Sequence, residues 1–427
     1  MKCAYKISSY SRINILALIF LIFIISQMQA AFGQAAPSST TTGNVYYVAT
    51  TGLDSNAGTI TAPFRTIQKA ANTVQAGDTV YVLPGTYTLT GPGAHPTYSN
   101  YASIYTSKSG TAAQPVQFIS TLKWGAKIVS TGNRIAWLND GAYVTIQGFD
   151  ITGTMGVGIL SNGNYSRIIG NHVHDYTSSY CDSSGSGTGI GSGRGNYVDI
   201  IGNLVDHLSV ASTCPAGQIH GIYAAYTGMR IINNVVNNVK NYCIHVYHAP
   251  VDNKIFSNTA FNCGSGIIVA GTAEGLAKNN SIKNNIIYQT VYYGIHEYAT
   301  TRDGTEAIKN NLIYKTGILP AISTDDPTTA VSGNIISLTA TQEAALFVNY
   351  QAGGSGDYRL QSTSPAINAG ATLGVPYNVD YDGVSRPQEI LTIFLPQVLI
   401  PIPELQLLRG KLLLLRFLSL KLGTLLF

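Results

Sequence analysis

The chain repeats one short phrase, an aliphatic run that ends in Asn: RIIGN at residues 167–171, DIIGN at 199–203, RIINN at 230–234, KIFSN at 254–258, SIKNN at 281–285, AIKNN at 307–311 and AVSGN at 330–334. The final Asn residues lie 32, 31, 24, 27, 26 and 23 positions apart. A period of about 20–50 residues is typical of repeat architectures. Because each unit is built from short β-branched runs and is too short for a pair of helices, the repeat predicts an all-β, parallel β-solenoid with main rungs over residues 143–339.

A second phrase places a small residue before Ile in each unit. Its copies are Gly158-Ile159, Gly189-Ile190, Gly221-Ile222, Cys243-Ile244, Gly266-Ile267 and Gly294-Ile295. Alternate residues of a strand face opposite ways, so the Ile residues should point inward and stack as a core column. Asn tolerates left-handed backbone and binds the backbone at bends, so we expect the Asn column to be a structural ladder at a turn.

The N-terminus has the pattern of a secretory signal peptide over residues 1–33. Lys2, Lys6 and Arg12 precede an apolar run at 13–25, and small residues follow near Ala30. The apolar run is nearer in length to a signal core than to a membrane span, although an uncleaved anchor is the alternative. The sequence therefore predicts a secreted protein that starts with a Ser/Thr-rich linker at 34–43. The net charge of +4 is small and scattered, so no nucleic-acid partner is expected.

The segment 46–88 reads as strand, polar turn, helix, turn and strand. A helix at about 63–75 would present Phe64, Ile67, Ala71 and Val74 on one side, as a cap for the open end of a solenoid. This segment resembles the opening of the secreted right-handed parallel β-helix proteins of the pectate-lyase-like superfamily. The residues that carry the resemblance are Pro63, Phe64, Thr66, Ile67, Ala70, Gly77, Asp78 and Val80.

The resemblance covers residues 44–388 and implies a single-stranded right-handed parallel β-helix with an N-terminal capping helix. Members include polysaccharide lyases, epimerases and glycosidases as well as surface proteins, so the fold alone does not select an activity. The resemblance also implies Ca²⁺ as a cofactor, although the sequence shows no dense carboxylate set and no Cys/His spacing of a zinc site. The Leu-rich tail at 389–427 departs from the family pattern. It favours a shifted reading frame over a membrane-associated segment, and membrane contact is expected only if the tail is genuine.

Two cysteines occupy equivalent places in neighbouring rungs. Cys181 follows Asn171 by 10 residues and Cys214 follows Asn203 by 11. Stacked rungs are about 4.8 Å apart, within disulfide reach, so we predict a Cys181–Cys214 bridge. Cys243 and Cys263 fall at different rung positions and are expected to be free and buried.

Functional positions are sought where the repeat is broken. One residue after each Ile, Tyr223, His245 and His296 should face outward, and two residues further on Tyr247 and Tyr298 should do the same. His220 stands just before its small residue. Stacking would gather these side chains into an aromatic and imidazole groove, suited to stacking on sugar rings and to proton transfer, although packing alone could explain it.

Cations would matter for an acidic sugar, because the C5 proton becomes acidic only when the adjoining carboxylate is neutralised. Arg194, just past its Gly-Ile strand, is the expected partner of that carboxylate, and Arg230 lies near a neighbouring turn. A second cluster contains Asp206 and His207, where the Asn-bearing strand ends beside long loops. We assign catalytic roles to His220, Tyr223, His245 and Arg194, and substrate contacts to Asp206, His207, Arg230, Tyr247, His296 and Tyr298.

The resulting hypothesis is an extracellular, monomeric lyase that cleaves an extended acidic, uronate-containing polysaccharide by β-elimination. The alternatives are a non-catalytic carbohydrate-binding or cell-surface protein, a C5-epimerase and a glycosidase. A glycosidase needs two carboxylates facing one bond, and Glu297 is expected to point inward by strand alternation.

Overall fold

The computed structural model describes residues 43–97, 101–180, 187–214, 217–354 and 356–386. The expected signal peptide (1–33), the linker up to residue 42 and the Leu-rich tail (389–427) lie outside these ranges. Within them, no helix has both the length and the apolar character that crossing a bilayer requires.

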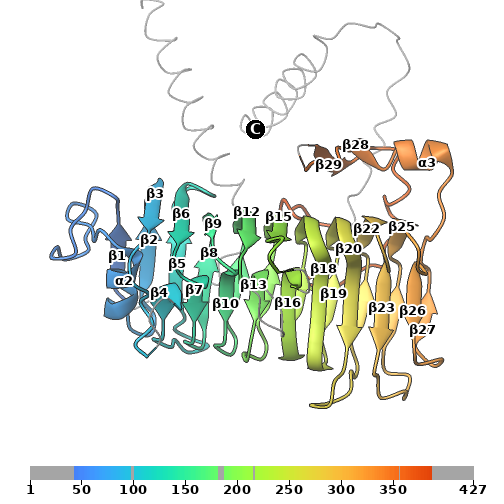
Figure 1. Cartoon of the computed structure of the whole chain (residues 1–427), viewed down its shortest axis with the longest axis horizontal. Helices are drawn as coiled ribbons and strands as arrows, with labels where there is room; N and C mark the ends of the chain where they lie inside the picture. Colours follow the sequence, from blue (N-terminus) through green and yellow to red (C-terminus); the bar gives the residue numbers. More distant parts are fainter. Residues whose placement is uncertain (1–42, 98–100, 181–186, 215–216, 355, 387–427) are drawn as a thin grey trace, which may run out of the picture. The chain divides into compact units, whose positions relative to one another are not determined.

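Eleven strands form one parallel sheet, which we call the first wall; Figure 1 shows the rungs side by side along it. In order of pairing the strands are β1 (Val45–Val48), β2 (Thr79–Val82), β5 (Val116–Ser120), β8 (Val144–Gln147), β11 (Arg167–Ile169), β14 (Asp199–Ile201), β17 (Arg230–Ile232), β19 (Lys254–Phe256), β21 (Ser281–Lys283), β24 (Ala307–Lys309) and β27 (Ala330–Ser332). From β11 to β27 the wall holds the aliphatic runs of the Asn phrase, one per rung.

A second parallel sheet of 16 strands supplies the other two walls. The second wall follows the Asn column and contains β3 (Gly85–Leu89), β6 (Ala126–Thr131), β9 (Asp150–Thr154), β12 (His172–Ser178), β15 (Leu204–Val210), β22 (Ile286–Thr290) and β25 (Leu312–Thr316). The third wall contains β4 (Ala102–Thr106), β7 (Ile135–Asn139), β10 (Val157–Ser161), β13 (Gly187–Ser192), β16 (Ile219–Thr227), β23 (Ile295–Tyr298) and β26 (Ile322–Thr324). Two long strands, β18 (Val235–Val251) and β20 (Thr259–Ala270), run through both walls and join them into one sheet.

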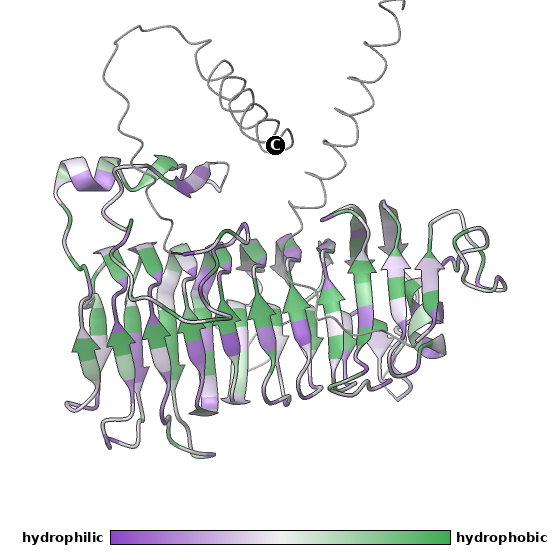
Figure 2. Cartoon of the chain, turned by 180° about the vertical axis from the view of Figure 1, so that it is seen from behind, coloured by the Kyte–Doolittle hydropathy of each residue, from purple (hydrophilic) through white to green (hydrophobic). Residues whose placement is uncertain are grey.

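The core lies inside the three walls. The predicted Ile column is confirmed: Ile159, Ile190, Ile222, Ile244, Ile267 and Ile295 pair in register and are all 0% exposed. Figure 2 shows apolar stretches, in green, in the strands of successive rungs. Stacking one apolar residue on its copy removes both from water. This stabilises the fold by about 25 cal/mol for each Å² of apolar surface buried.

The Asn column forms a continuous ladder at the turn between the first and second walls. Asn258 is typical: its backbone N–H and its side-chain amide donate to Asn285 Oδ1, both at 2.9 Å, and the amide also donates to the Ile231 carbonyl at 2.9 Å. The left-handed residue of the turn is the one before the Asn, such as Gly170 (φ 61°) or Ser257 (φ 57°). The ladder therefore satisfies buried backbone groups that the sharp turn leaves without strand partners.

Two further elements cover parts of the solenoid. The helix α2 (Ile67–Thr73) is shorter than the expected segment, since Thr66 caps it by accepting a hydrogen bond from Lys69 N, and it buries Ile67 against the core. After β27 the chain forms α3 (Ala340–Ala344) and a hairpin of β28 (Phe347–Asn349) and β29 (Asp357–Leu360). Phe347 packs with Phe261 and Tyr288 on the outside of the second wall.

The expectation that Cys243 and Cys263 are free is wrong, because they form a disulfide with Cα atoms 5.6 Å apart. Cys243 occupies the small-residue column of the third wall, and Cys263 lies on the second wall of the next rung, paired with Val239. Both side chains point into the shared interior and are at most 1% exposed. Sulfur atoms on different walls can therefore meet, which a comparison of equivalent rung positions does not reveal. Cys214 is also disulfide-bonded, whereas Cys181, its expected partner, lies outside the described residues.

Candidate functional site

Six aromatic and imidazole side chains gather on the third wall, and we call them the aromatic face. They are His220, Tyr223, Tyr242, His245, Tyr247 and His248. Strand pairing places them, because Tyr223 stands opposite His245 and His220 opposite Tyr242 in adjacent rungs. Ring centroids are 4.7 Å apart for His245 and Tyr247 and 4.9 Å for His220 and His245. The structure thus brings together four residues that the repeat had singled out.

His296 and Tyr298 extend the aromatic face across one intervening rung. Ile268 separates His245 from His296 in the register. Ala270 stands opposite Tyr298, and His296 and Tyr298 lie together with ring centroids 4.8 Å apart. The aromatic face is therefore continued by these two residues over the rungs of β20 and β23.

Sequence reasoning missed three members of this site. Tyr242 precedes its small residue as His220 does, so the same column could have identified it. His248 has a left-handed backbone (φ 73°) and lies within the register shift between β16 and β18, so the repeat gives no signal for it. Glu274 comes from the loop after β20, accepts a hydrogen bond from His248 Nδ1 at 2.8 Å and another from the Tyr226 phenol at 3.0 Å.

Burial keeps the two inner imidazoles neutral. It lowers the pKa of His220 to about 3, and it lowers the pKa of His245 well below its usual value, with the charge of His220 adding to the effect. The Nδ1 atom of His220 and both ring nitrogens of His245 are buried without hydrogen-bond partners. A polysaccharide at the surface cannot reach these three atoms. The catalytic roles of His220 and His245 stay predictions, and His248 offers a more exposed imidazole on the same face.

His248 is the accessible imidazole of the aromatic face. Its side chain is 31% exposed, and its Nδ1 atom is held by Glu274. The hydrogen bonds from Tyr226 and then His248 lower the pKa of Glu274, so its carboxylate is ionised and fixes the ring. With Nδ1 donating to Glu274, the His248 Nε2 lone pair is available to accept a proton.

Two phenols of the site have raised pKa values. Burial, followed by the charges of Tyr247, Tyr226 and Glu274, raises the pKa of Tyr223, so this phenol keeps its proton. Its ring meets that of His248 edge to face, with centroids 6.1 Å apart. Burial and Glu274 also raise the pKa of the Tyr226 phenol, and the charge of exposed Arg194 opposes that rise. Arg194 is therefore electrostatically coupled to this end of the aromatic face.

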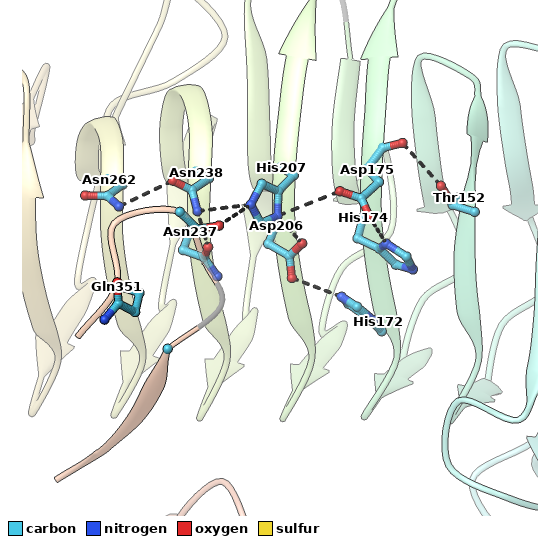
Figure 3. Close-up of polar contacts among 12 residues, drawn as sticks. Thr152, His172, His174, Asp175, Asp206, His207, Asn237, Asn238, Asn262 and Gln351 are labelled. Carbon is cyan, nitrogen blue, oxygen red and sulfur yellow. Dashed lines mark hydrogen bonds and ion pairs between the residues drawn. The ribbon is translucent and has the colours of Figure 1, made fainter. Parts of the chain in front are cut away.

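Three predicted substrate-binding residues lie elsewhere. Arg230 is on the first wall, where its guanidinium binds the Asp199 carboxylate through two nitrogens. Asp206 and His207 are on β15 of the second wall, in the group of polar side chains shown in Figure 3. The structure does not bring these three residues to the aromatic face.

A Ca²⁺ ion does not fit the aromatic face. This ion takes about six to eight oxygen ligands, many of them carboxylates. Among the described residues around Tyr223 and His248 we find one carboxylate, Glu274, and it is already bound to Tyr226 and His248. The chemistry of this face therefore depends on its own side chains.

Comparison with known proteins confirms the resemblance noted in the sequence. Residues 46–201 match the family model described as Pel9A-like, right handed beta helix region. Pectate lyase PEL9 of Emericella nidulans is 42% identical over 69 residues, which are 16% of this chain and 14% of that protein. The structure is similar to pectate lyase Pel9A at a TM-score of 0.56, with 16% identity, covering 78% of this chain and 92% of that one. A rhamnogalacturonan lyase matches at a TM-score of 0.47 and 15% identity, covering 75% and 96% of the two chains.

These similarities establish the fold as a right-handed parallel β-helix. The family match ends at Ile201, before the strands that carry the aromatic face. The chemistry of that face must therefore be argued from its own residues.

Proposed function

We propose that this protein is a secreted polysaccharide-active β-helix protein that cleaves an acidic, uronate-containing polysaccharide by β-elimination at the aromatic face. The observation that carries the proposal is the accessible His248–Glu274 pair beside tyrosine rings on an outer wall. Aromatic rings stack on the apolar faces of sugars, and an oriented imidazole is suited to proton transfer near neutral pH. The similarity to pectate lyases supports the same class of substrate.

The reaction would proceed with two side chains exchanging protons with the sugar. The Nε2 lone pair of His248 takes the C5 proton, and the electrons of the C5–H bond form the C4–C5 double bond. The C4–O bond breaks, and the leaving oxygen takes the proton of the Tyr223 phenol. Arg194 would neutralise the uronate carboxylate, which makes the C5 proton acidic. Solvent then returns His248 and Tyr223 to their starting states.

A panel of polysaccharides tests this proposal. Pectate, alginate and glycosaminoglycans are incubated with the protein, with and without a chelator, and the ultraviolet absorbance of the unsaturated uronate is followed. We expect product from at least one of them. His248→Ala should lower kcat/KM by about 10²–10⁴-fold, the range that general acid–base groups contribute. His95→Ala, which changes a His on another part of the fold, should leave the rate unchanged.

Other outcomes identify the alternatives. Glycan binding without any product would replace the lyase by a carbohydrate-binding protein. New reducing ends without unsaturation would indicate a glycosidase, and an altered uronate epimer at constant chain length would indicate a C5-epimerase. A lyase rate that survives His248→Ala would remove His248 from the mechanism.

A further inference from the structure

Six ionisable side chains form a second cluster on the second wall, which we call the His/Asp cluster. They are Asp150 on β9, His172, His174 and Asp175 on β12, and Asp206 and His207 on β15. Strand pairing sets His172 opposite Asp150, and His174 opposite Asp206. Figure 3 shows the members on β12 and β15, which come from neighbouring rungs: His172, His174, Asp175, Asp206 and His207.

Two imidazoles converge on one carboxylate within this cluster. His172 Nδ1 lies 3.6 Å from Asp150 Oδ2, and His174 Nε2 lies 3.2 Å from Asp150 Oδ1. The rings are stacked with centroids 3.8 Å apart. The three donor atoms lie within 4.8 Å of one another. Ligand atoms held about 2.0–2.2 Å from one metal ion are at most about 4.4 Å apart, so a small inward movement of these side chains would suit one ion.

The opposite nitrogen of each ring is held by a further carboxylate. His172 Nε2 is 2.9 Å from Asp206 Oδ2, and His174 Nδ1 is 2.8 Å from Asp175 Oδ2. Asp206 is fixed in turn by His207 Nδ1 at 2.7 Å. In metal sites the ligating His almost always donates its other N–H to a carboxylate, carbonyl or water, which orients the lone pair toward the metal. Both imidazoles of this cluster show that arrangement.

One buried nitrogen among these three side chains has no hydrogen-bond partner. His174 Nε2 is buried and has no hydrogen-bond partner, because its approach to Asp150 meets the distance but not the angle of a hydrogen bond. The side chains of Asp150, His172 and His174 are only 12–17% exposed. Trp124 stacks on His172 at 4.9 Å and donates its indole N–H to the Gly170 carbonyl, which shields one side. Asp150 is thus within ion-pair distance of this buried nitrogen without satisfying it as a hydrogen-bond acceptor.

We propose that Asp150, His172 and His174 bind a divalent transition-metal ion such as Zn²⁺, with Asp206 and Asp175 orienting the two imidazoles. Two nitrogen donors and one carboxylate suit zinc and its neighbours in the first transition row, whereas Ca²⁺ and Mg²⁺ select oxygen donors. Three protein ligands leave a coordination position for water. The site is separate from the aromatic face, so it stands whether or not the proposed lyase activity is found.

The signal for this site in the sequence is the pair His172 and His174, two residues apart on one strand and therefore on one face. No Cys is involved, which is why a search for zinc-finger spacings does not find it. Asp150 comes from the preceding rung, so the triad exists only in the folded solenoid.

Binding of Zn²⁺ and Co²⁺ to the chelator-treated full-length protein tests the proposal. Calorimetry should show one Zn²⁺ per chain, with Ca²⁺ binding far more weakly at the same concentration. Co²⁺ should give a visible absorption band of a nitrogen- and oxygen-ligated ion, which Zn²⁺ removes. His174→Ala should abolish binding, and Asp206→Asn should weaken it by about 10–100-fold through loss of the oriented imidazole.

The matched control is His248→Ala, which removes an imidazole bound to a carboxylate on the third wall and should leave Zn²⁺ affinity unchanged. Far-ultraviolet circular dichroism checks that each variant is folded, and the Co²⁺ spectrum of the unmodified protein needs no variant. Absence of Zn²⁺ binding, retention of full affinity in His174→Ala, or equal affinity for Ca²⁺ would each overturn the proposal.

Discussion

At the residue scale, the Asn ladder shows how much one side chain can contribute to a repeat. Asn258 accepts hydrogen bonds from the backbone N–H of Asn234 at 2.9 Å and from its side-chain amide at 3.0 Å, while donating to Asn285 and Ile231. It is 1% exposed, so water cannot replace these partners. The ladder makes each rung depend on both of its neighbours.

We predict that Asn258→Ala lowers the free energy of unfolding by about 3 kcal/mol or more. Each buried group left without a partner costs about 1–3 kcal/mol, and this change strands groups in two adjacent rungs. Urea unfolding measures the effect. Asn72→Ala, at an exposed position of α2, is the control and should change stability by less than about 0.5 kcal/mol. Equal stabilities of the two variants would show that the ladder is dispensable.

At the element scale, β18 and β20 join two walls and carry the interior disulfide. Cys243 and Cys263 are separated by 20 residues in sequence. Closing a loop of this size restricts the unfolded chain and stabilises the fold by about 3 kcal/mol in the chain-entropy account. The bond also fixes the rung on which His245 and His248 stand.

The double variant Cys243→Ala/Cys263→Ala should therefore unfold at lower urea concentration, with a loss of about 2–4 kcal/mol. Because both cysteines are at most 1% exposed, reductant should attack the native disulfide only when the rungs open. Thiol labelling over time during native-state reduction measures that opening. Immediate reduction without denaturant would mean that the second and third walls separate readily.

At the scale of the whole molecule, the stability of the solenoid should depend on pH through one buried pair. Glu297 is 0% exposed, as its inward orientation predicted, and Glu306 is 1% exposed. Burial and then the charge of Glu297 raise the pKa of Glu306 to about 8, and burial raises that of Glu297. Both carboxyl groups therefore keep a proton to higher pH than a free glutamic acid does. A raised carboxyl pKa means that the folded chain holds a proton that the unfolded chain has released.

The stabilisation from this pair is thus complete below about pH 4.5 and is lost as the pH rises through about 8. We predict that Glu297→Gln reduces this loss, because a Gln amide can donate to ionised Glu306 while its oxygen still accepts from Thr324 and Thr329. Urea unfolding at several pH values measures the slope. Glu343→Gln removes a carboxyl whose pKa Lys315 and Tyr288 lower despite partial burial, so it should leave the slope between about pH 4.5 and 8 as it is. An unaltered slope in Glu297→Gln would contradict the assignment.

The sequence predicted the columns of equivalent residues but missed contacts between residues at non-equivalent positions of the rungs. The Ile and Asn columns follow from periodicity, because stacking places equivalent residues in register. The Cys243–Cys263 bond and the His172–Asp150 contact join positions that are not equivalent, and they depend on how the walls fold around one interior. His248 was missed because it lies within a shift of the strand register, and His220 and His245 were preferred because the repeat cannot tell which ring nitrogens are buried.

The Asn ladder also gives every rung the same hydrogen-bonding pattern toward its neighbours. Each Asn accepts a hydrogen bond from the rung before it and donates one to the Asn of the rung after it, from Asn171 through Asn311. Every rung therefore offers the same acceptor and the same donor. A rung of about 26 residues with its own Asn, inserted between two of these Asn residues, could form the same hydrogen bonds with both neighbouring rungs. The length of the solenoid and the chemistry displayed on its walls can therefore evolve independently, by duplication for the one and by point substitution for the other.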